Sequence, residues 1–203
     1  MSKKLTDKQL AGLARKYGFP EDVVRAVVEV ESRGSGFDSQ GRVTILFEPH
    51  IFYREINDPR IRDTAVQKGL AYRTWGTLKY PKDSYPRFSQ AFALDPVAAM
   101  KSCSWGMGQV MGFNHVAAGF DEVGLMVDAF KESEANQIEG MLAFIKEEGL
   151  DDELMAKNWS AFARGYNGPG YAKNGYHTKL KKAFDKWVKV PDIQLDEEKK
   201  CAV

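Results

Sequence analysis

The sequence predicts a mainly α fold, a helical bundle with one small β-hairpin or sheet beside a helix that ends in a glutamate. Helix-capping patterns recur along the chain, and apolar residues repeat with helical spacing over several segments. One segment, RVTILFEPH at 42–50, alternates β-branched and aromatic residues as a strand does. At 203 residues, the chain is long enough to bury one sizeable core.

The helices can be placed in chain order from their start and stop signals. Thr6 with Gln9 forms a capping-box pattern for a first helix to about Lys16, and Pro20 suits the first turn of a second helix that ends before Gly34. A glycine-rich turn at 34–41 leads into the strand, and turn formers at 57–86 predict loops with short helices. Further helices are expected from Asp95, from Asp121, from Ser133 to Gly149, at 151–157, at 159–166 and around 179–189.

The chain shows no internal repeat and no shift in composition. Residues 1–190 are therefore expected to form a single catalytic domain, and the polar residues 191–203 a flexible tail. A net charge of +1, from 29 basic and 28 acidic residues, gives no electrostatic reason to expect a nucleic-acid partner.

Targeting, disulfide and metal signals are also weak. No apolar run reaches the length of a signal peptide or of a membrane span, which predicts no stable membrane insertion and a protein held in a reducing cytoplasm. Cys103 and Cys201 do not suggest a disulfide. Neither CxxC nor HExxH occurs and the three histidines are far apart, so no metal and no other cofactor is expected.

The second helix carries a carboxylate on its apolar face. At about 100° per residue, one third of the circumference holds Val24, Val27, Val28 and Glu31, and the opposite face holds Asp22, Arg25 and Glu29. Burial disfavours the charged form, so we expect the pKa of Glu31 to be raised, as a general acid requires near neutral pH. The alternative is a glutamate that turns outward or pairs with Arg33.

Three further features are glycine-rich segments with polar and aromatic residues: VVEVESRGSGF at 27–37, SCSWGMGQVMGFN at 102–114 and FARGYNGPGY at 162–171. Glycines allow close backbone approach to another group, although tight helix packing explains them as well. Tyr166 and Asn167 precede a Gly-Pro-Gly turn that would hold a phenol and an amide at the edge of a cleft, and a plain helix cap would look similar.

In combination, these segments resemble the lysozyme-like superfamily, whose members carry Glu-Ser at a helix end, a later Gly-Leu-Met-Gln-like segment and a Tyr-Asn-x-Gly-Pro turn. Glu31-Ser32, GMGQVMG and ARGYNGPG occupy those places here. The chain is most similar to the phage endolysin N-acetylmuramidases, in which SCSWGxxQxMG, LFEPH and FARxYNGPxY recur. The resemblance runs from about Leu5 to Phe184 and implies an α+β lysozyme-like fold.

The resemblance implies a glycoside hydrolase that cleaves the β-1,4 bond from N-acetylmuramic acid to N-acetylglucosamine in bacterial peptidoglycan, with Glu31 as general acid. Such an enzyme usually needs a second carboxylate. Glu48 is preferred because a strand holds it and because LFEPH belongs to the resemblance, whereas Asp38 lies in a Gly-Ser turn. Glu48 could instead be a structural acid paired with His50 or Arg54, and Asp38 could simply cap its turn.

Substrate binding is expected to use amides and aromatic faces. By motif position the resemblance assigns Gln109, Tyr166, Asn167, Ser104 and Trp105 to this role, and Tyr171 is added for its aromatic character alone. Any of these aromatic residues could instead belong to the core. Cys103 is expected to be a small buried residue rather than a nucleophile.

Two other functions remain compatible with the motifs. A lytic transglycosylase needs only one carboxylate and leaves anhydromuramic ends, and a non-catalytic wall-binding module would keep the fold without the chemistry. As an endolysin, the protein would remain in the host cytoplasm until a separate holin opened the membrane and released it to the wall or periplasm. A monomer is the default expectation.

Overall fold

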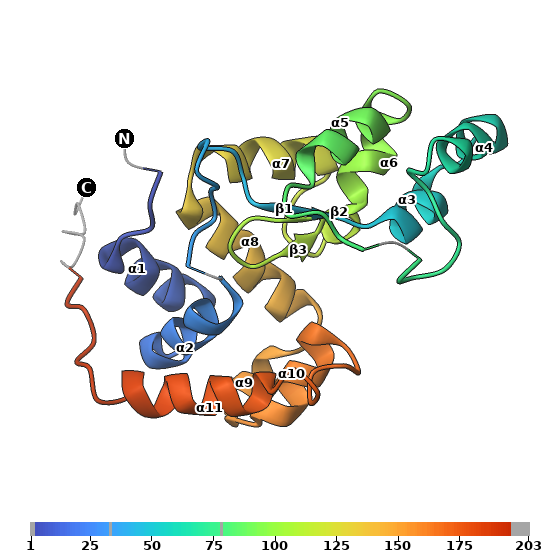
Figure 1. Ribbon diagram of the computed structural model, residues 1–203. Helices are drawn as coiled ribbons and strands as arrows, with labels where there is room; N and C mark the ends of the chain where they lie inside the picture. The colour runs from blue at the N-terminus through green and yellow to red at the C-terminus, as the bar shows by residue number, and fades with distance from the viewer. Residues whose placement is uncertain (1–2, 33, 78, 196–203) are drawn as a thin grey trace, which may run out of the picture.

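The computed structural model describes residues 3–32, 34–77 and 79–195. Within these ranges the chain forms eleven α-helices, one 3-10 helix and a three-stranded antiparallel sheet in the order β1-β2-β3. Figure 1 shows the sheet in the upper part with α3 to α7, a lower group with α1, α2 and α9 to α11, and α8 crossing between them. The predicted mainly α class with a small sheet is confirmed.

The bounds of the elements are as follows. The helices are α1 (Asp7–Tyr17), α2 (Glu21–Glu31), α3 (Pro49–Glu55), α4 (Pro59–Gln67), α5 (Tyr85–Phe92), α6 (Pro96–Lys101), η1 (Gly112–Asn114), α7 (Val123–Glu132), α8 (Glu134–Glu147), α9 (Asp151–Met155), α10 (Trp159–Asn167) and α11 (Tyr176–Trp187). The strands are β1 (Ile45–Phe47), β2 (Cys103–Trp105) and β3 (Val110–Met111).

The predicted helix starts are present because polar side chains satisfy the first backbone N–H groups. Thr6 and Gln9 form the capping box of α1. Asp95 accepts a hydrogen bond from the N–H of Ala98 at the start of α6, and Ser133 accepts one from Asn136 at the start of α8. Local capping chemistry therefore sets these boundaries.

The sheet is larger than the single strand signal predicts. Strand β1 pairs with β2, with Leu46 opposite Ser104, and β2 turns back into β3. The two additional strands come from the glycine-rich segment at 102–114, which carries no alternation long enough to be read as a strand. Gly106, with φ 68°, supplies the left-handed residue that this turn requires.

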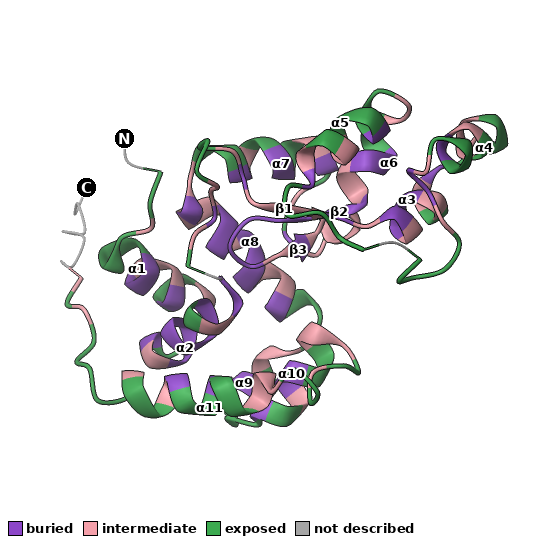
Figure 2. Ribbon diagram, in the orientation of Figure 1, coloured by how far each residue is buried: buried purple, intermediate pink, exposed green. Residues whose placement is uncertain are grey.

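Helix α2 is buried along most of its length (Figure 2), and of the face opposite its apolar side Glu29 is exposed, as expected, whereas Arg25 is buried. Arg25 and Glu21 are each 8% exposed and form an ion pair one helical turn apart. The ring of Trp187 lies 4.9 Å from the Arg25 guanidinium. The expectation of a solvent-facing Arg25 is wrong because α11 packs along α2 and covers it.

Helix α8 carries a buried amide that joins two loops. Gln137 is 0% exposed. Its Oε1 accepts a hydrogen bond from the N–H of Met107 at 2.9 Å, and its Nε2 donates to the carbonyls of Phe130 at 2.8 Å and Gly36 at 3.4 Å. The amide thus connects the loop after α2 to the β2–β3 turn.

Glu134, one turn earlier on α8, anchors the same loop. Its carboxylate accepts hydrogen bonds from the N–H of Gly36 at 3.0 Å and of Leu5 at 2.9 Å, and it pairs with Lys4. Although burial opposes ionisation, these N–H groups and the Lys4 ammonium hold the pKa of Glu134 below its usual value. The ionised carboxylate therefore stabilises the loop.

The segment after α11 runs back along α2, where the N–H of Ile193 donates to the carboxylate of Glu21 at 3.0 Å. Residues 196–203 of the predicted tail lie outside the described residues. Among the helices of the described ranges, none combines the length and the apolar character needed to cross a bilayer.

Gly36→Ala should destabilise the protein strongly, because a Cβ at this position would lie 1.8 Å from Oε1 of Gln137. We expect the free energy of unfolding to fall by about 2 kcal/mol or more, because the added methyl group overpacks the site and breaks hydrogen bonds of Gln137. Urea denaturation measures this change. Gly12→Ala is the matched control, since its Cβ meets nothing within 4 Å and a helical alanine should add up to about 1 kcal/mol. Equal stability of the two variants would contradict the packing described.

Candidate active site

The three glycine-rich segments meet at the end of α2. Glu31 is its last residue and is only 8% exposed. The amide Nδ2 of Asn167, at the end of α10, donates to Oε1 of Glu31 at 3.1 Å. The outward-turning alternative for Glu31 is thereby excluded, because its carboxyl group lies in the interior and is held by a side chain from the third segment.

Tyr166 brings in the second segment. Its hydroxyl donates to the carbonyl of Gly108 at 2.7 Å, and its ring stacks on Phe162 with centroids 5.4 Å apart. Burial raises the pKa of Tyr166 well above its usual value, and the nearby carboxylate of Glu31 raises it further. The phenol therefore remains a protonated donor, and it locks α10 onto the β2–β3 turn beside Glu31.

Gln109 and Ser104 hold this turn together. The Ser104 hydroxyl donates to Oε1 of Gln109 at 2.9 Å, and Nε2 of Gln109 donates to the carbonyl of Gly106 at 2.8 Å. Gln109 has φ 48°, a left-handed conformation that is costly for a residue other than glycine. Such local strain is often found at functional sites. Substrate contact by either residue stays a prediction.

Trp105 is almost entirely buried. It is 2% exposed, its Nε1 donates to the carbonyl of Met100 at 2.9 Å, and its ring packs edge-on against Phe88. These contacts favour the core alternative for Trp105, although it also lines a pocket together with Phe88 and Met100. Substrate contact by Trp105 stays a prediction.

Tyr171 closes the Gly-Pro-Gly turn. Its N–H donates to the carbonyl of Gly168 at 3.2 Å, and its half-buried ring meets His177 edge-on with centroids 5.5 Å apart. These contacts fix the turn that follows Asn167. A role of Tyr171 in substrate binding stays a prediction.

Asp38 has the contacts of a turn cap. Its Oδ1 accepts hydrogen bonds from the N–H groups of Gln40 at 2.9 Å and Arg42 at 3.0 Å, and its Oδ2 pairs with the Arg42 guanidinium at 2.7 Å. Partial burial opposes ionisation, but these donors outweigh it and lower the pKa of Asp38. Both oxygens are therefore engaged in holding the turn.

Glu48 follows β1 and occupies the position before the first residue of α3, where its side chain makes no capping hydrogen bond. Nδ1 of His50 lies 3.3 Å from Oε2 of Glu48, and the Tyr80 hydroxyl donates to the same oxygen. The contact with His50 is one that the structural alternative for Glu48 names, whereas Arg54 contacts Glu55 instead. The catalytic role of Glu48 stays a prediction. In Figure 1, β1 leads directly into α3, whereas α2 lies in the lower group of helices.

Two further features concern metal ligands and the buried cysteine. Among the described residues, no group of three or more His, Cys, Asp or Glu side chains could hold a metal ion. Cys103 is 0% exposed, and burial, with a further contribution from Glu48, raises its pKa well above the usual value. A buried protonated thiol is the inert residue that the sequence predicts.

The sequence interpretation missed the positioning residues Glu134 and Gln137. The sequence contains a signal for both residues. Glu134 is four residues before Ile138 and Gln137 is four residues before Met141, so both lie on the apolar face predicted for α8. Polar residues on such a face need buried partners. What the sequence could not show is that the partners are the loops after α2 and β2.

Comparisons with known proteins agree with this geometry. A family model described as Muramidase, N-acetylmuramidase, matches residues 20–188. The chain belongs to the N-acetylmuramidase family. It is also similar to the crystal structure of the Burkholderia AP3 phage endolysin, with a TM-score of 0.84 and 36% identity over 93% of this chain and 73% of that chain. Among curated proteins, no sequence matches.

As a member of the N-acetylmuramidase family, the protein is a glycoside hydrolase of peptidoglycan. The match begins at Pro20, the residue before α2, and ends just after α11, so it includes Glu31, Glu48 and Asn167.

Asn167→Ala should lower the rate of peptidoglycan hydrolysis by about tenfold, because it removes a hydrogen bond to an acidic group worth about 1.5 kcal/mol. Turbidity loss of a sacculus suspension measures the rate. Asn174→Ala, a substitution of an exposed residue after the same turn, is the matched control and should retain the wild-type rate. A wild-type rate in Asn167→Ala would show that the contact with Glu31 has no part in the reaction.

Proposed function

We propose that this N-acetylmuramidase is a phage endolysin that hydrolyses the β-1,4 bond from N-acetylmuramic acid to N-acetylglucosamine during host lysis. The similarity to the Burkholderia AP3 phage endolysin supports the endolysin role. The observation that carries the chemistry is the hydrogen bond from Asn167 to Glu31, because it joins segments 136 residues apart around one buried carboxyl group.

Glu31 is the proposed general acid. A buried carboxyl group favours its protonated form, and that proton passes to the glycosidic oxygen as the bond to the muramic sugar breaks. Asn167 orients the carboxyl group through Oε1, and Tyr166 fixes the adjacent backbone at Gly108. The sugar ring gains oxocarbenium character in this step, which creates the need for a second carboxylate.

Glu48 is the better candidate for the second carboxylate. Both contacts of its carboxylate within the described residues fall on Oε2, which leaves Oε1 able to accept a proton from water. Asp38, in contrast, uses both oxygens to hold its turn. In this mechanism Glu48 activates the water that attacks the sugar, and the product has a reducing muramic end.

The proposed substrate-binding residues come from the second and third segments, and Tyr166 and Asn167 belong to the same set. Gln109 and Ser104 present polar groups at the β2–β3 turn, and Tyr171 presents a half-buried ring after Asn167. Amides and hydroxyls can bond the N-acetyl and hydroxyl groups of the sugars, and aromatic faces can stack on the rings.

The remaining parts of the proposal concern the whole molecule. Residues 1–190 form one catalytic domain, and the protein acts as a monomer on the wall. It stays in the host cytoplasm until a separate holin makes a lesion in the membrane, and then degrades the peptidoglycan of the periplasm or cell wall.

Glu31→Gln should lower the rate of product formation by at least about 100-fold, because glutamine keeps the size of the side chain but has no acidic proton. Mass spectrometry of fragments released from purified peptidoglycan measures it. Wild type should release fragments with reducing muramic ends. Anhydro ends would identify a lytic transglycosylase, and binding to sacculi without any fragments would identify a wall-binding module.

Glu48→Gln and Asp38→Asn should separate the two candidate carboxylates. We expect Glu48→Gln to lower kcat by about 100-fold through loss of the base. Asp38→Asn should keep kcat and lose about 1 kcal/mol of stability from weakened hydrogen bonds. Steady-state kinetics on soluble peptidoglycan fragments and urea denaturation measure the two effects. The reverse pattern would make Asp38 the second carboxylate.

A further inference from the structure

Within the described part of the chain, the contacts of the Glu48 carboxylate fall on one oxygen. The Tyr80 hydroxyl donates to Oε2, and Nδ1 of His50 lies 3.3 Å from the same atom. We propose that Tyr80 and His50 are positioning residues that hold Oε2 of Glu48 and direct Oε1 toward the attacking water. This inference rests on the proposed function of Glu48 as the second carboxylate.

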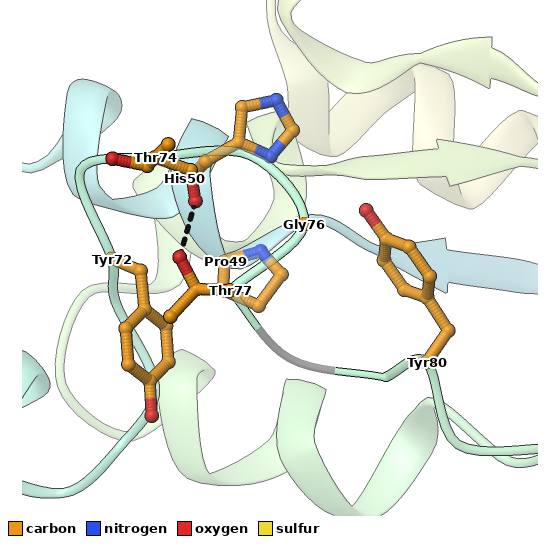
Figure 3. Close-up of a pocket in the computed structure, with 7 residues that line it drawn as sticks. All are labelled: Pro49, His50, Tyr72, Thr74, Gly76, Thr77 and Tyr80. Atoms are coloured by element: carbon orange, nitrogen blue, oxygen red, sulfur yellow. Dashed lines mark hydrogen bonds between the residues drawn. The ribbon is translucent and has the colours of Figure 1, made fainter.

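The loop that carries Tyr80 is tied to α3, the helix that follows Glu48. The N–H of Tyr72 donates to the carbonyl of Pro49 at 3.3 Å, and Nε of Arg73 donates to the Tyr53 hydroxyl at 2.9 Å. A hydrogen bond of 2.7 Å from Thr77 to the carbonyl of Thr74 closes a turn within the loop (Figure 3). These ties bring Tyr80 back to the start of α3, so its hydroxyl is placed by the fold.

Figure 3 shows the small pocket between this loop and the start of α3. Its lining includes Pro49, His50, Tyr72 and Tyr80, and its volume is about 10 Å³, close to the space that one water molecule needs. The two groups that contact Glu48 therefore belong to one compact structure that spans the loop and the helix start.

Glu48 stands at a helix start without capping it. A carboxylate before the first residue of a helix commonly accepts hydrogen bonds from the free N–H groups of the first turn, and the Glu48 side chain makes none. Its side chain contacts Tyr80 and His50 instead, and remains 15% exposed. These two contacts fix the orientation of the carboxylate, and the kinetic test below separates a positioned base from a structural acid.

The Tyr80 hydroxyl keeps its proton. Burial and the hydrogen bond to Glu48 raise the pKa of Tyr80 above its usual range, against opposing contributions from a hydrogen bond with Trp75 and the charge of Arg87. His50 donates whenever a proton is on Nδ1, in the neutral or the charged ring. Cys103 also lies near Glu48, and its buried thiol is protonated. When hydrogen bonds hold one oxygen of a carboxylate base, the lone pairs of the other oxygen keep a fixed orientation toward the attacking water.

The test is a double-mutant cycle between Tyr80 and Glu48 on soluble peptidoglycan fragments. Tyr80→Phe should lower kcat by about tenfold with KM changed less than about twofold, because only the orientation of the base is lost. In a Glu48→Gln background the same substitution should change kcat less than about twofold. An equal loss of kcat in both backgrounds, or no loss in the wild-type background, overturns the inference.

Tyr85→Phe is the matched control. This substitution also removes a phenol hydrogen bond, because the Tyr85 hydroxyl donates to the carbonyl of Val43 at 2.7 Å. That hydroxyl does not bond to Glu48. The kcat of Tyr85→Phe should equal that of the wild type, and a loss equal to that of Tyr80→Phe would identify a general effect on the fold. Wild-type kcat in Glu48→Gln itself would instead remove the proposed role of Glu48.

His50 gives an independent test if Glu48→Gln has no measurable residual activity. His50→Ala should lower kcat several-fold, whereas His50→Asn should restore it, because the amide nitrogen of asparagine occupies the place of Nδ1. Equal kcat values for the two variants overturn the role of His50. Melting temperatures within a few degrees of the wild type establish that each variant is folded.

Discussion

The fully buried amide of Gln137 is the constraint on which the candidate site depends. It hydrogen-bonds the loop after α2 and the β2–β3 turn at the same time, and a Cβ on Gly36 or Gly106 would lie 1.8 Å or 2.7 Å from its side chain. A buried amide without partners is costly, so both loops must remain where this side chain can reach them. Glu134 adds a second anchor to the first loop. Helix α8 thereby sets where Glu31 and the carbonyl of Gly108 lie, although it supplies no group to the proposed chemistry.

The two proposed catalytic carboxylates lie in different environments, as their different roles require. Glu31 is 8% exposed, and its carboxyl group accepts a hydrogen bond from the amide of Asn167. The Glu48 side chain is 15% exposed, and its carboxylate is contacted by a phenol and an imidazole. Glu31 is the last residue of α2, whereas Glu48 follows β1. The acid and the base of the proposed mechanism thus come from different secondary-structure elements.

Local patterns in the sequence predicted most of the helices, because capping side chains act within one turn of the residue they cap. They also place Glu31 on the apolar face of its helix, where the structure buries it, but they do not predict that Asn167 contacts it. Strands β2 and β3 escape prediction because two- and three-residue strands show no period, and Arg25 is assigned to solvent because only α11, far along the chain, covers it. The burial of Trp105 has a similar origin. Its inward orientation follows from the pairing of β2 with β1, which is a long-range contact.

The hydrogen bond between Asn167 and Glu31 also bears on when the site forms during folding. It closes a chain segment of 136 residues, and contacts of such high sequence separation form only after much of the chain has been ordered. Helix α2 and the turn after α10 can each form early from local signals, but neither alone contains the site. Hydrolytic activity during refolding would therefore appear with the last cooperative step, and a partly folded chain would be inactive even where its helices were complete.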